Sequence, residues 1–294
     1  MRILVVGDVM LDRYIIGRYT RKSPEADVPI ILVPRGGPTS RLGGAANVAR
    51  ACRILGAKHV DLWGNVGGDT TGASIMLKLT KSGVNPSGLM TNLKRTIVKT
   101  RVLAGTQQVC RVDEEDIGVD VQYSRGQLGR LFNLASEADR IVVSDYNKGC
   151  ITEAVMAVLE PFAERVYIDP KPVHRALYGH CAVIKPNAEE VYMMAPAPTH
   201  AESAMALRDA LGVSVVATSG YAGAVLAELG AATPRFYSGH EVETVDAIGA
   251  GDIFMAALAV CEKPLVDAVD YANRTAALST TQPFTYCPGE SNEA

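Results

Sequence analysis

A glycine-rich turn ending in a carboxylate lies near the end of the chain, at Gly249, Ala250, Gly251 and Asp252. An apolar stretch typical of a buried helix follows from Ile253 onwards. The first N–H groups of a helix have no intrahelical partner and share the positive end of its dipole, so residues 249–251 suit an anion hole for a phosphoryl group. Asp252 beside them suits a general base that takes the proton from an attacking hydroxyl. The competing interpretation is an aspartate that only complements the helix dipole.

A second glycine-rich segment enters a helix-like stretch of small residues at Gly43, Gly44 and Asn47. Glycine lets the backbone approach a ligand closely, and an asparagine amide both donates and accepts. With the two segments in this order and about 200 residues apart, the chain resembles the PfkB-type carbohydrate kinases, the family that includes ribokinase. The resemblance implies transfer of the γ-phosphate of ATP to a sugar hydroxyl, with Asp252 as the base. Phosphoryl transfer of this kind implies ATP and Mg²⁺ as cofactors.

Within this family the chain most resembles the heptose 7-phosphate kinases. The segments that carry this resemblance are 7–14, 23–26, 43–49, 107–113, 144–149 and 168–171. It implies transfer to O1 of D-glycero-D-manno-heptose 7-phosphate, which gives the 1,7-bisphosphate, a lipopolysaccharide precursor. Some such kinases carry a nucleotidyltransferase domain behind the kinase, and we expect this chain to supply the kinase step alone. Two alternatives stay open: a kinase for another sugar or a nucleoside on the same fold, and a non-catalytic sugar-binding homologue.

The resemblance also implies contacts to the substrate. The matching positions are Asp12, Gly43, Gly44, Asn47, Arg111, Lys148, Asp169 and Lys171. A carboxylate such as Asp12 accepts hydrogen bonds from neighbouring sugar hydroxyls, although a turn residue after the first strand is the alternative. For Asn47 the alternative is a helix cap. Arg111, Lys148 and Lys171 suit a phosphorylated sugar, and the sequence leaves open which of them meets the phosphate.

Contacts to the nucleotide are implied in the second half of the chain. The matching positions are Asn187, Glu190, Thr218, Gly220, Gly223 and Asn273. Asn187 and Glu190 match an Asn-x-x-Glu element near the magnesium, which Glu190 would hold through water. The same spacing is that of a helix capping box, and the two interpretations carry equal weight. A strand-ending turn accounts for Thr218 and the glycines without a ligand, and a polar helix position accounts for Asn273.

Short apolar runs that end in polar residues alternate with helix-like stretches. The runs are 3–6, 141–143, 166–168, 182–184 and 213–217, and the stretches are 44–55, 70–81, 122–137, 152–162 and 201–211. This alternation predicts an α/β fold with a doubly wound, mostly parallel sheet, which the resemblance specifies as a ribokinase-like three-layer αβα sandwich. We expect each strand to end in a polar loop, the first of them at Gly7-Asp8, because ligands bind beyond the carboxyl ends of such strands.

Two segments, 14–33 and 96–112, break this alternation with β-branched residues between polar ones. They predict antiparallel strands in a small β-sheet lid, formed by about residues 12–41 and 92–113 and inserted in a single kinase domain of residues 1–294. The exposed edge of such a lid could pair with a second subunit. We therefore expect a homodimer through the lid sheet.

Composition excludes several classes of protein. With 48% hydrophobic and 21% charged residues, the chain is typical of a globular domain. A net charge of -3 with scattered Lys and Arg argues against a nucleic-acid partner. The six cysteines form no Cys-x-x-Cys pair, and the five histidines show no metal-ligand spacing. No apolar run approaches the ~20 residues of a membrane span, so we expect a cytoplasmic protein without a membrane partner.

Two features depart from the family pattern. Ala247 stands where a hydroxyl residue usually follows Asp246, which puts catalytic efficiency or ion dependence in question. The tail from Thr281 to Glu290 shows little resemblance, so contacts to the nucleotide base are the least specified part of the site.

Overall fold

The computed structural model describes residues 1–116 and 121–290 of the chain. Its central sheet has the strand order β13-β12-β11-β10-β9-β8-β1-β4-β5. Neighbouring strands from β11 to β5 pair in parallel, whereas β12 and β13 add an antiparallel edge. The strands of this sheet are β1 (Arg2–Lys22), β4 (His59–Gly67), β5 (Asn85–Leu93), β8 (Arg140–Ser144), β9 (Val166–Asp169), β10 (Val183–Ile184), β11 (Ser214–Thr218), β12 (Gly223–Ala227) and β13 (Arg235–Ser238).

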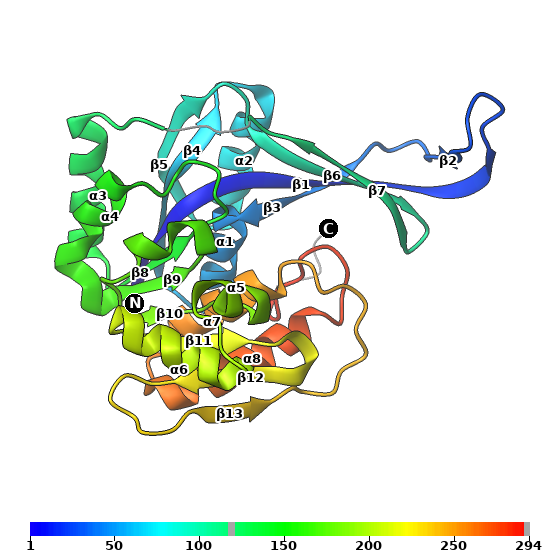
Figure 1. Cartoon of the computed structure of the whole chain (residues 1–294). Helices are drawn as coiled ribbons and strands as arrows, with labels where there is room; N and C mark the ends of the chain where they lie inside the picture. The colour runs from blue at the N-terminus through cyan, green and yellow to red at the C-terminus, as the bar shows by residue number, and fades with distance from the viewer. Residues whose placement is uncertain (117–120, 291–294) are drawn as a thin grey trace.

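Helices cover both faces of the central sheet and give three layers (Figure 1). One face packs against α3 (Arg125–Glu137), α4 (Glu153–Leu159), α5 (Ala188–Met194) and α6 (His200–Leu211), and the other against α1 (Ala45–Ile54), α2 (Thr70–Lys81), α7 (Ala250–Val260) and α8 (Leu265–Ser279). Along β1, Leu4 and Val6 face the first layer while Ile3 and Val5 face the second. Burial on both faces explains the continuous apolar run. The predicted fold class is confirmed.

Local sequence explains where most helices begin. The side chains of Asp69, Ser124, Thr152 and Thr199 each accept a hydrogen bond from a backbone N–H in the first turn of the following helix. The helix-like stretch 152–162 is interrupted: α4 ends at Leu159 and a 3-10 helix, η1 (Glu160–Arg165), follows with a proline in its first turn. Proline lacks the N–H that an α-helix would need there, so the helix changes form.

The first strand does not end where the sequence predicted. β1 passes through Gly7 and Asp8 and runs for 21 residues, so the expected turn at Gly7-Asp8 is wrong. Asp8 is buried without a turn because its carboxylate accepts hydrogen bonds from the backbone N–H groups of Tyr146, Lys148 and Cys150. Beyond this point the strand changes partners instead of leaving the sheet.

The outer part of β1 builds a second sheet that projects from the core (Figure 1). It pairs antiparallel with β3 (Thr39–Gly44) and parallel with β6 (Ile97–Ala104), and β6 forms a hairpin with β7 (Gln107–Glu114). The last residues of β1 pair with β2 (Pro29–Leu32). We call the sheet formed by residues 9–22 with β2, β3, β6 and β7 the lid sheet. The β6–β7 loop has two residues between the paired Ala104 and Gln107, and Gly105 takes the positive φ of +63° that such a turn requires.

Two further sequence expectations concern the whole chain. All six cysteines lie in the described ranges and are free thiols, most of them buried. Within the described residues, no helix combines the length and apolar character needed to cross a membrane.

Candidate active site

Asp252 lies in the first turn of α7, 5% exposed, and both of its carboxylate oxygens accept hydrogen bonds. Asn47 donates from Nδ2 to Oδ2 over 2.9 Å, and the Tyr146 hydroxyl donates to Oδ1 over 2.6 Å. Gly249 precedes the helix with a φ of +81°, and a Cβ there would lie 3.0 Å from Asn47 Nδ2. Only glycine fits this turn without displacing the amide that orients the carboxylate.

Burial raises the pKa of Asp252 to about 6. The hydrogen bonds from Asn47 and Tyr146 oppose this rise, as does the nearby charge of Lys185, whereas the charge of Asp169 adds to it. Desolvation disfavours the charged form of a carboxylate, and donors favour it. Asp252 is therefore ionised at neutral pH yet much more basic than an exposed aspartate, which suits a general base.

Asn47 is itself held in place by Arg50, which joins it to the end of the chain. Arg50 Nη2 donates to Asn47 Oδ1 over 3.1 Å and to the Thr285 carbonyl over 2.5 Å, and Arg50 Nη1 pairs with Glu290 over 2.9 Å. Asp246 makes a second tie, because its carboxylate accepts the N–H groups of Ile248 and Phe284. The tail, which the sequence left unassigned, thus closes one wall of the site.

The start of α7, where the sequence predicts an anion hole, leaves two backbone N–H groups open instead of three. The Ala250 N–H donates back to the Ala247 carbonyl over 3.2 Å, which leaves the amides of Gly251 and Asp252 as the first-turn donors without an intrahelical partner. Lys185 adds a positive charge: its Nζ would lie 3.7 Å from a Cβ on Gly251. This lysine is only 3% exposed and pairs with Asp169 over 3.2 Å.

Asp252 opens onto a pocket of about 260 Å³ between α7 and the lid sheet. The pocket is lined by Met10, Asp12, Gly44, Lys99, Arg101, Arg111, Tyr146, Ile248, Gly249, Asp252 and Thr285. Within the described residues, the buried Oγ1 of Thr285 has no hydrogen-bond partner, so it is available to a ligand. A larger and more open depression of about 530 Å³ lies at residues 16–18 and 32–34 of the lid sheet, and it includes none of these groups.

Three cations line the lid side of this pocket. Arg101 and Arg111 stand directly opposite each other in the β6–β7 register. Like charges in that position disfavour a sheet unless an anion lies between or beside them. Arg101 is ion-paired with the buried Asp12, while Lys99 and Arg111 both bond Asp113, over 3.2 Å and 2.9 Å. Burial raises the pKa of Asp12, and Arg101 opposes that rise.

The predicted substrate residues fall into two groups. Asp12, Gly44 and Arg111 line the pocket with Asp252, Asn47 bonds Asp252, and a Cβ on Gly43 would lie 2.4 Å from Asp12 Oδ2. The other three lie elsewhere.

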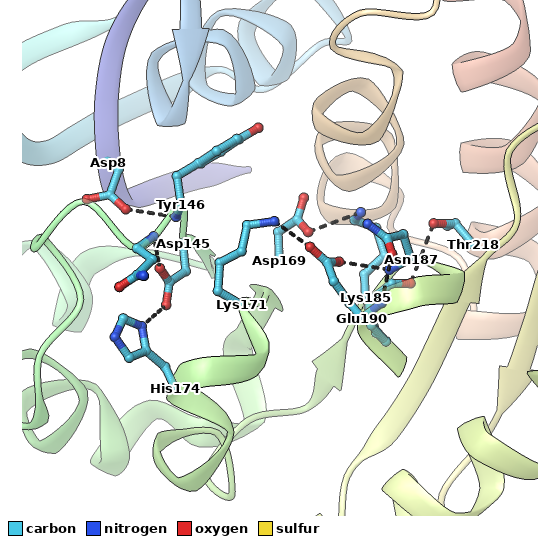
Figure 2. Close-up of polar contacts among 12 residues, drawn as sticks. Asp8, Asp145, Tyr146, Asp169, Lys171, His174, Lys185, Asn187, Glu190 and Thr218 are labelled. Atoms are coloured by element: carbon cyan, nitrogen blue, oxygen red, sulfur yellow. Dashed lines mark hydrogen bonds and ion pairs between the residues drawn. The ribbon is translucent and has the colours of Figure 1, made fainter. Parts of the chain in front are cut away.

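Lys148, Asp169 and Lys171 are not among the residues that line the pocket. Lys148 pairs with Glu115 over 2.7 Å. Asp169 pairs with Lys185, and Lys171 pairs with Glu190 while its Nζ lies 5.6 Å from the centroid of the Tyr146 ring. Lys171 and Asp169 lie between Tyr146 and the ends of β9 and β10 (Figure 2).

Three of the predicted nucleotide residues, Asn187, Glu190 and Thr218, lie at or just beyond the ends of β10 and β11 and make hydrogen bonds within the protein (Figure 2). Asn187 and Glu190 form a complete capping box on α5, with both reciprocal hydrogen bonds at 2.9 Å. The Thr218 N–H donates to the Pro186 carbonyl over 2.9 Å. Asn273 on α8 donates to the Ser238 carbonyl over 2.8 Å.

The two glycines predicted to contact the nucleotide both have positive φ, +56° at Gly220 and +101° at Gly223. A Cβ on Gly223 would lie 1.9 Å from the Tyr237 carbonyl oxygen, so the close approach of β13 requires this glycine. Gly220 meets no such neighbour within 4 Å. It begins a short 3-10 helix, η3 (Gly220–Ala222), and is exposed.

The oxygen donors beside α5 fit a magnesium ion held through water. No group of three or more His, Cys, Asp or Glu side chains within the described ranges converges as a metal cage. Glu190 spends one oxygen on Lys171 and the other on the Asn187 N–H. Mg²⁺ usually keeps several waters and takes phosphate oxygens as ligands, so a carboxylate whose two oxygens each already accept one hydrogen bond fits as an outer partner through water.

Sequence reasoning gave no role to Tyr146, Lys185 or the buried pair Asp8 and Asp145. Asp145 accepts hydrogen bonds from the Tyr178 hydroxyl and the Asn147 N–H, and its Oδ2 lies 2.6 Å from His174 Nδ1. Burial and the charge of Asp145 raise the pKa of Asp8 to about 6. The available signal was position: all four residues lie at or just beyond the end of an apolar run, where a doubly wound sheet gathers its site.

Comparison with known proteins identifies the family. The model of the pfkB family of carbohydrate kinases matches residues 2–290. Bifunctional protein HldE of Caulobacter sp. (strain K31) is 36% identical over 94% of this chain and 58% of that protein, and HldE of Helicobacter pylori (strain ATCC 700392 / 26695) is 33% identical over 94% and 62%. The chain thus spans about three fifths of these relatives.

Solved structures show the same fold. Arabidopsis thaliana ribokinase complexed with ribose and ATP superposes with a TM-score of 0.75 at 20% identity, covering 96% of this chain and 93% of that one. Ribokinase from Thermotoga maritima gives 0.74 at 20% identity, covering 96% and 94%. The predicted class of enzyme, a phosphotransferase that acts on a sugar hydroxyl, is confirmed with the family. This chain belongs to the pfkB family of carbohydrate kinases.

Proposed function

We propose that this chain transfers the γ-phosphate of ATP to O1 of a sugar that already carries a phosphate, and that the sugar is D-glycero-D-manno-heptose 7-phosphate. The observation that carries the proposal is the pocket in which Asp252 faces Lys99, Arg101 and Arg111. A neutral sugar needs no such cluster, whereas a sugar phosphate is an anion that the half-exposed Arg111 can bind in place of, or together with, its partner Asp113. The segments shared with heptose 7-phosphate kinases and the two HldE relatives support the choice of sugar.

In this proposal the lid sheet and α7 hold opposite ends of the sugar. The phosphate lies against Arg111 and its neighbours, while Asp12 accepts hydrogen bonds from ring hydroxyls. This places the anomeric hydroxyl at the Asp252 carboxylate, next to the start of α7. Orientation by both ends lowers the entropic part of the barrier before any bond changes.

Asp252 takes the proton from the sugar hydroxyl as the oxygen of that hydroxyl bonds to the γ-phosphorus. The bond from that phosphorus to the β–γ bridging oxygen breaks, and ADP leaves with the electron pair. The amides of Gly251 and Asp252, with the Lys185 ammonium, stabilise the charge on the transferring phosphoryl oxygens. Glu190 would hold a magnesium ion through water, and that ion would supply positive charge to the phosphates of ATP.

The function is tested by a coupled assay of ADP release with ATP, Mg²⁺ and a panel of acceptors. The panel contains the heptose 7-phosphate, the same heptose without phosphate, ribose and a nucleoside. We expect release with the heptose 7-phosphate and much less with the unphosphorylated sugar. Release with ribose or the nucleoside would keep Asp252 as the base but overturn the role of the lid cations. Sugar binding without any release would identify a non-catalytic homologue.

We also propose that two lid sheets pair in a homodimer. All eight residues of β7 are exposed. Tyr19 on β1, Leu32 on β2 and Val28 just before β2 are at least half exposed, and Leu32 lines the 530 Å³ depression. An open edge with apolar side chains is a template for pairing. Sedimentation of Leu32→Asp should give a monomer, whereas Leu77→Asp, at an equally exposed leucine on α2, should leave the mass unchanged. A native chain that sediments as a monomer contradicts this proposal.

A further inference from the structure

The Tyr146 hydroxyl is bonded to the oxygen of Asp252 that faces the pocket. Asn47 holds Oδ2 and Tyr146 holds Oδ1. Of these two donors, Tyr146 lines the 260 Å³ pocket and Asn47 is not among its described lining residues. Oδ1 is therefore the oxygen that an acceptor hydroxyl meets, and in this structure a tyrosine hydroxyl already lies there at 2.6 Å.

The backbone around Tyr146 is fixed on several sides. Its N–H donates to Asp8 Oδ2 over 2.7 Å, and the next residue, Asn147, has a φ of +55° and donates its N–H to Asp145 Oδ1 over 2.7 Å. A non-glycine residue in this region of φ persists only where its surroundings hold it there. The hydroxyl can therefore leave Asp252 by rotation of the side chain while the loop stays in place.

Tyr146 can only donate to Asp252. Burial and the charge of Asp252 raise the pKa of the phenol well above its usual value, so it stays protonated. Before transfer, the hydroxyl of the acceptor sugar must also donate a hydrogen bond to the general base, as the tyrosine hydroxyl does here. The two hydroxyls must then compete for one oxygen.

We propose that the Tyr146 hydroxyl holds the pocket-facing oxygen of Asp252 until the sugar displaces it, and so keeps water from serving as the acceptor. This inference rests on the proposed function. Without the tyrosine hydroxyl, Asp252 can take a proton from water as the water oxygen bonds to the γ-phosphorus. The bond to the bridging oxygen then breaks, and ADP leaves with the electron pair, which yields ADP and inorganic phosphate. The tyrosine thus sets the choice between sugar and water.

The test compares Tyr146→Phe with Tyr178→Phe in the full chain with ATP and Mg²⁺, measuring inorganic phosphate in the absence of sugar. Tyr178 is a matched control, because its hydroxyl also donates to a buried aspartate over 2.6 Å, but that aspartate is Asp145. We expect the ratio of sugar-free hydrolysis to sugar phosphorylation to rise roughly tenfold in Tyr146→Phe, the scale of one hydrogen bond to a charged group. Tyr178→Phe should keep the native ratio.

Two further readouts separate this role from a purely structural one. Loss of the competing hydroxyl should lower the KM for the sugar. The hydrogen bond from Tyr146 lowers the pKa of Asp252, so its loss should raise that pKa and shift the acidic limb of kcat/KM to higher pH. The other groups that act on the carboxylate, Asn47, Asp169 and Lys185, stay in place in this variant. Normal sugar phosphorylation with unchanged hydrolysis in Tyr146→Phe would overturn the inference, as would lost phosphorylation with no gain in hydrolysis. A native chain that phosphorylates no sugar would overturn the proposed function instead, and the hydrolysis comparison would still decide the role of Tyr146.

Discussion

The proposed acceptor side and the proposed nucleotide side of the site are built differently. On the acceptor side, charged groups from α7 and the lid sheet converge on an open pocket, and Thr285 Oγ1 is left without a partner in the described chain. On the nucleotide side, Asn187, Glu190 and Asn273 are bonded to backbone or to one another. A polar group left open indicates a ligand more strongly than one whose bonds are already made. The acceptor side therefore carries more of the functional argument, and the nucleotide motifs also serve the fold.

The largest effect should come from Asp252→Asn, which removes the base but keeps the shape of the side chain. We expect kcat to fall by roughly 10²–10⁴-fold, the usual share of a general base. Asp267→Asn is the matched control, because Asp267 is an exposed acid in the first turn of the neighbouring helix α8. Equal losses in both variants would mean that Asp252 acts only on the helix dipole. The acceptor side would then lack its proposed base.

The second effect should come from Lys185→Met, at the boundary between the two sides. Loss of one fixed positive charge beside the transferring phosphoryl group should lower kcat on the order of 10²-fold. The variant also leaves Asp169 without its partner, which can cost roughly 3–5 kcal/mol of stability. Adding Asp169→Asn should restore the thermal midpoint but not kcat. If the double variant regains activity as well, Lys185 is structural.

Acid pH should separate activity from stability. Asp252 must be ionised to act, so kcat/KM should fall about tenfold per pH unit below its pKa of about 6. Because the folded pKa values of Asp252 and Asp8 lie above the unfolded value, their contribution to stability increases as pH falls from 6 towards 3.8. Thermal unfolding across this range should show no loss from these two groups while activity declines. Joint loss of activity and folding near pH 6 would contradict the assignment.

The smallest effect should come from Arg111→Met, because this side chain is 51% exposed and its charge is screened. We expect the KM for the sugar phosphate to rise about three- to tenfold, with kcat nearly unchanged and the effect reduced at high salt. Arg130→Met, at an exposed arginine on α3, controls for net charge. An equal rise in KM for an unphosphorylated sugar would show that Arg111 does not bind a phosphate of the substrate.

Elements of the fold were predicted correctly wherever local sequence determines local structure. Helix α2 begins and ends at the predicted Thr70 and Lys81, since Asp69 caps it and its apolar residues keep a helical period. The first strand was wrong because a local pattern does not show that Asp8 is neutralised by backbone groups about 140 residues away. Acids after an apolar run usually mark a turn, and here a distant loop satisfies the acid within the strand.

The site divides in the same way. Gly249 and Asp252 lie within four consecutive residues, so the sequence predicted the turn and the proposed base together. Tyr146 is 106 residues from Asp252, and no spacing rule connects the two. Lys99 and Arg101 could have been predicted as site residues from the sequence. Residues two apart on a strand share a face, and Arg101 stands opposite the predicted Arg111. Pairing of β6 with β7 was the missing step.

The length of β1 has a mechanical consequence. One uninterrupted backbone passes from the middle of the core to the tip of the lid sheet, and it carries Asp8 and Asp12 on the way (Figure 1). Residues 10–14 are hydrogen-bonded to β3 on one side and β6 on the other, so this part of the strand cannot bend at a single joint, whereas residues 15–22 have a partner on one side only. Asp8 lies on this strand, and its carboxylate accepts a hydrogen bond from the backbone N–H of Tyr146. The backbone that carries the lid sheet is thus also the backbone that holds the segment of Tyr146, whose hydroxyl donates to Asp252.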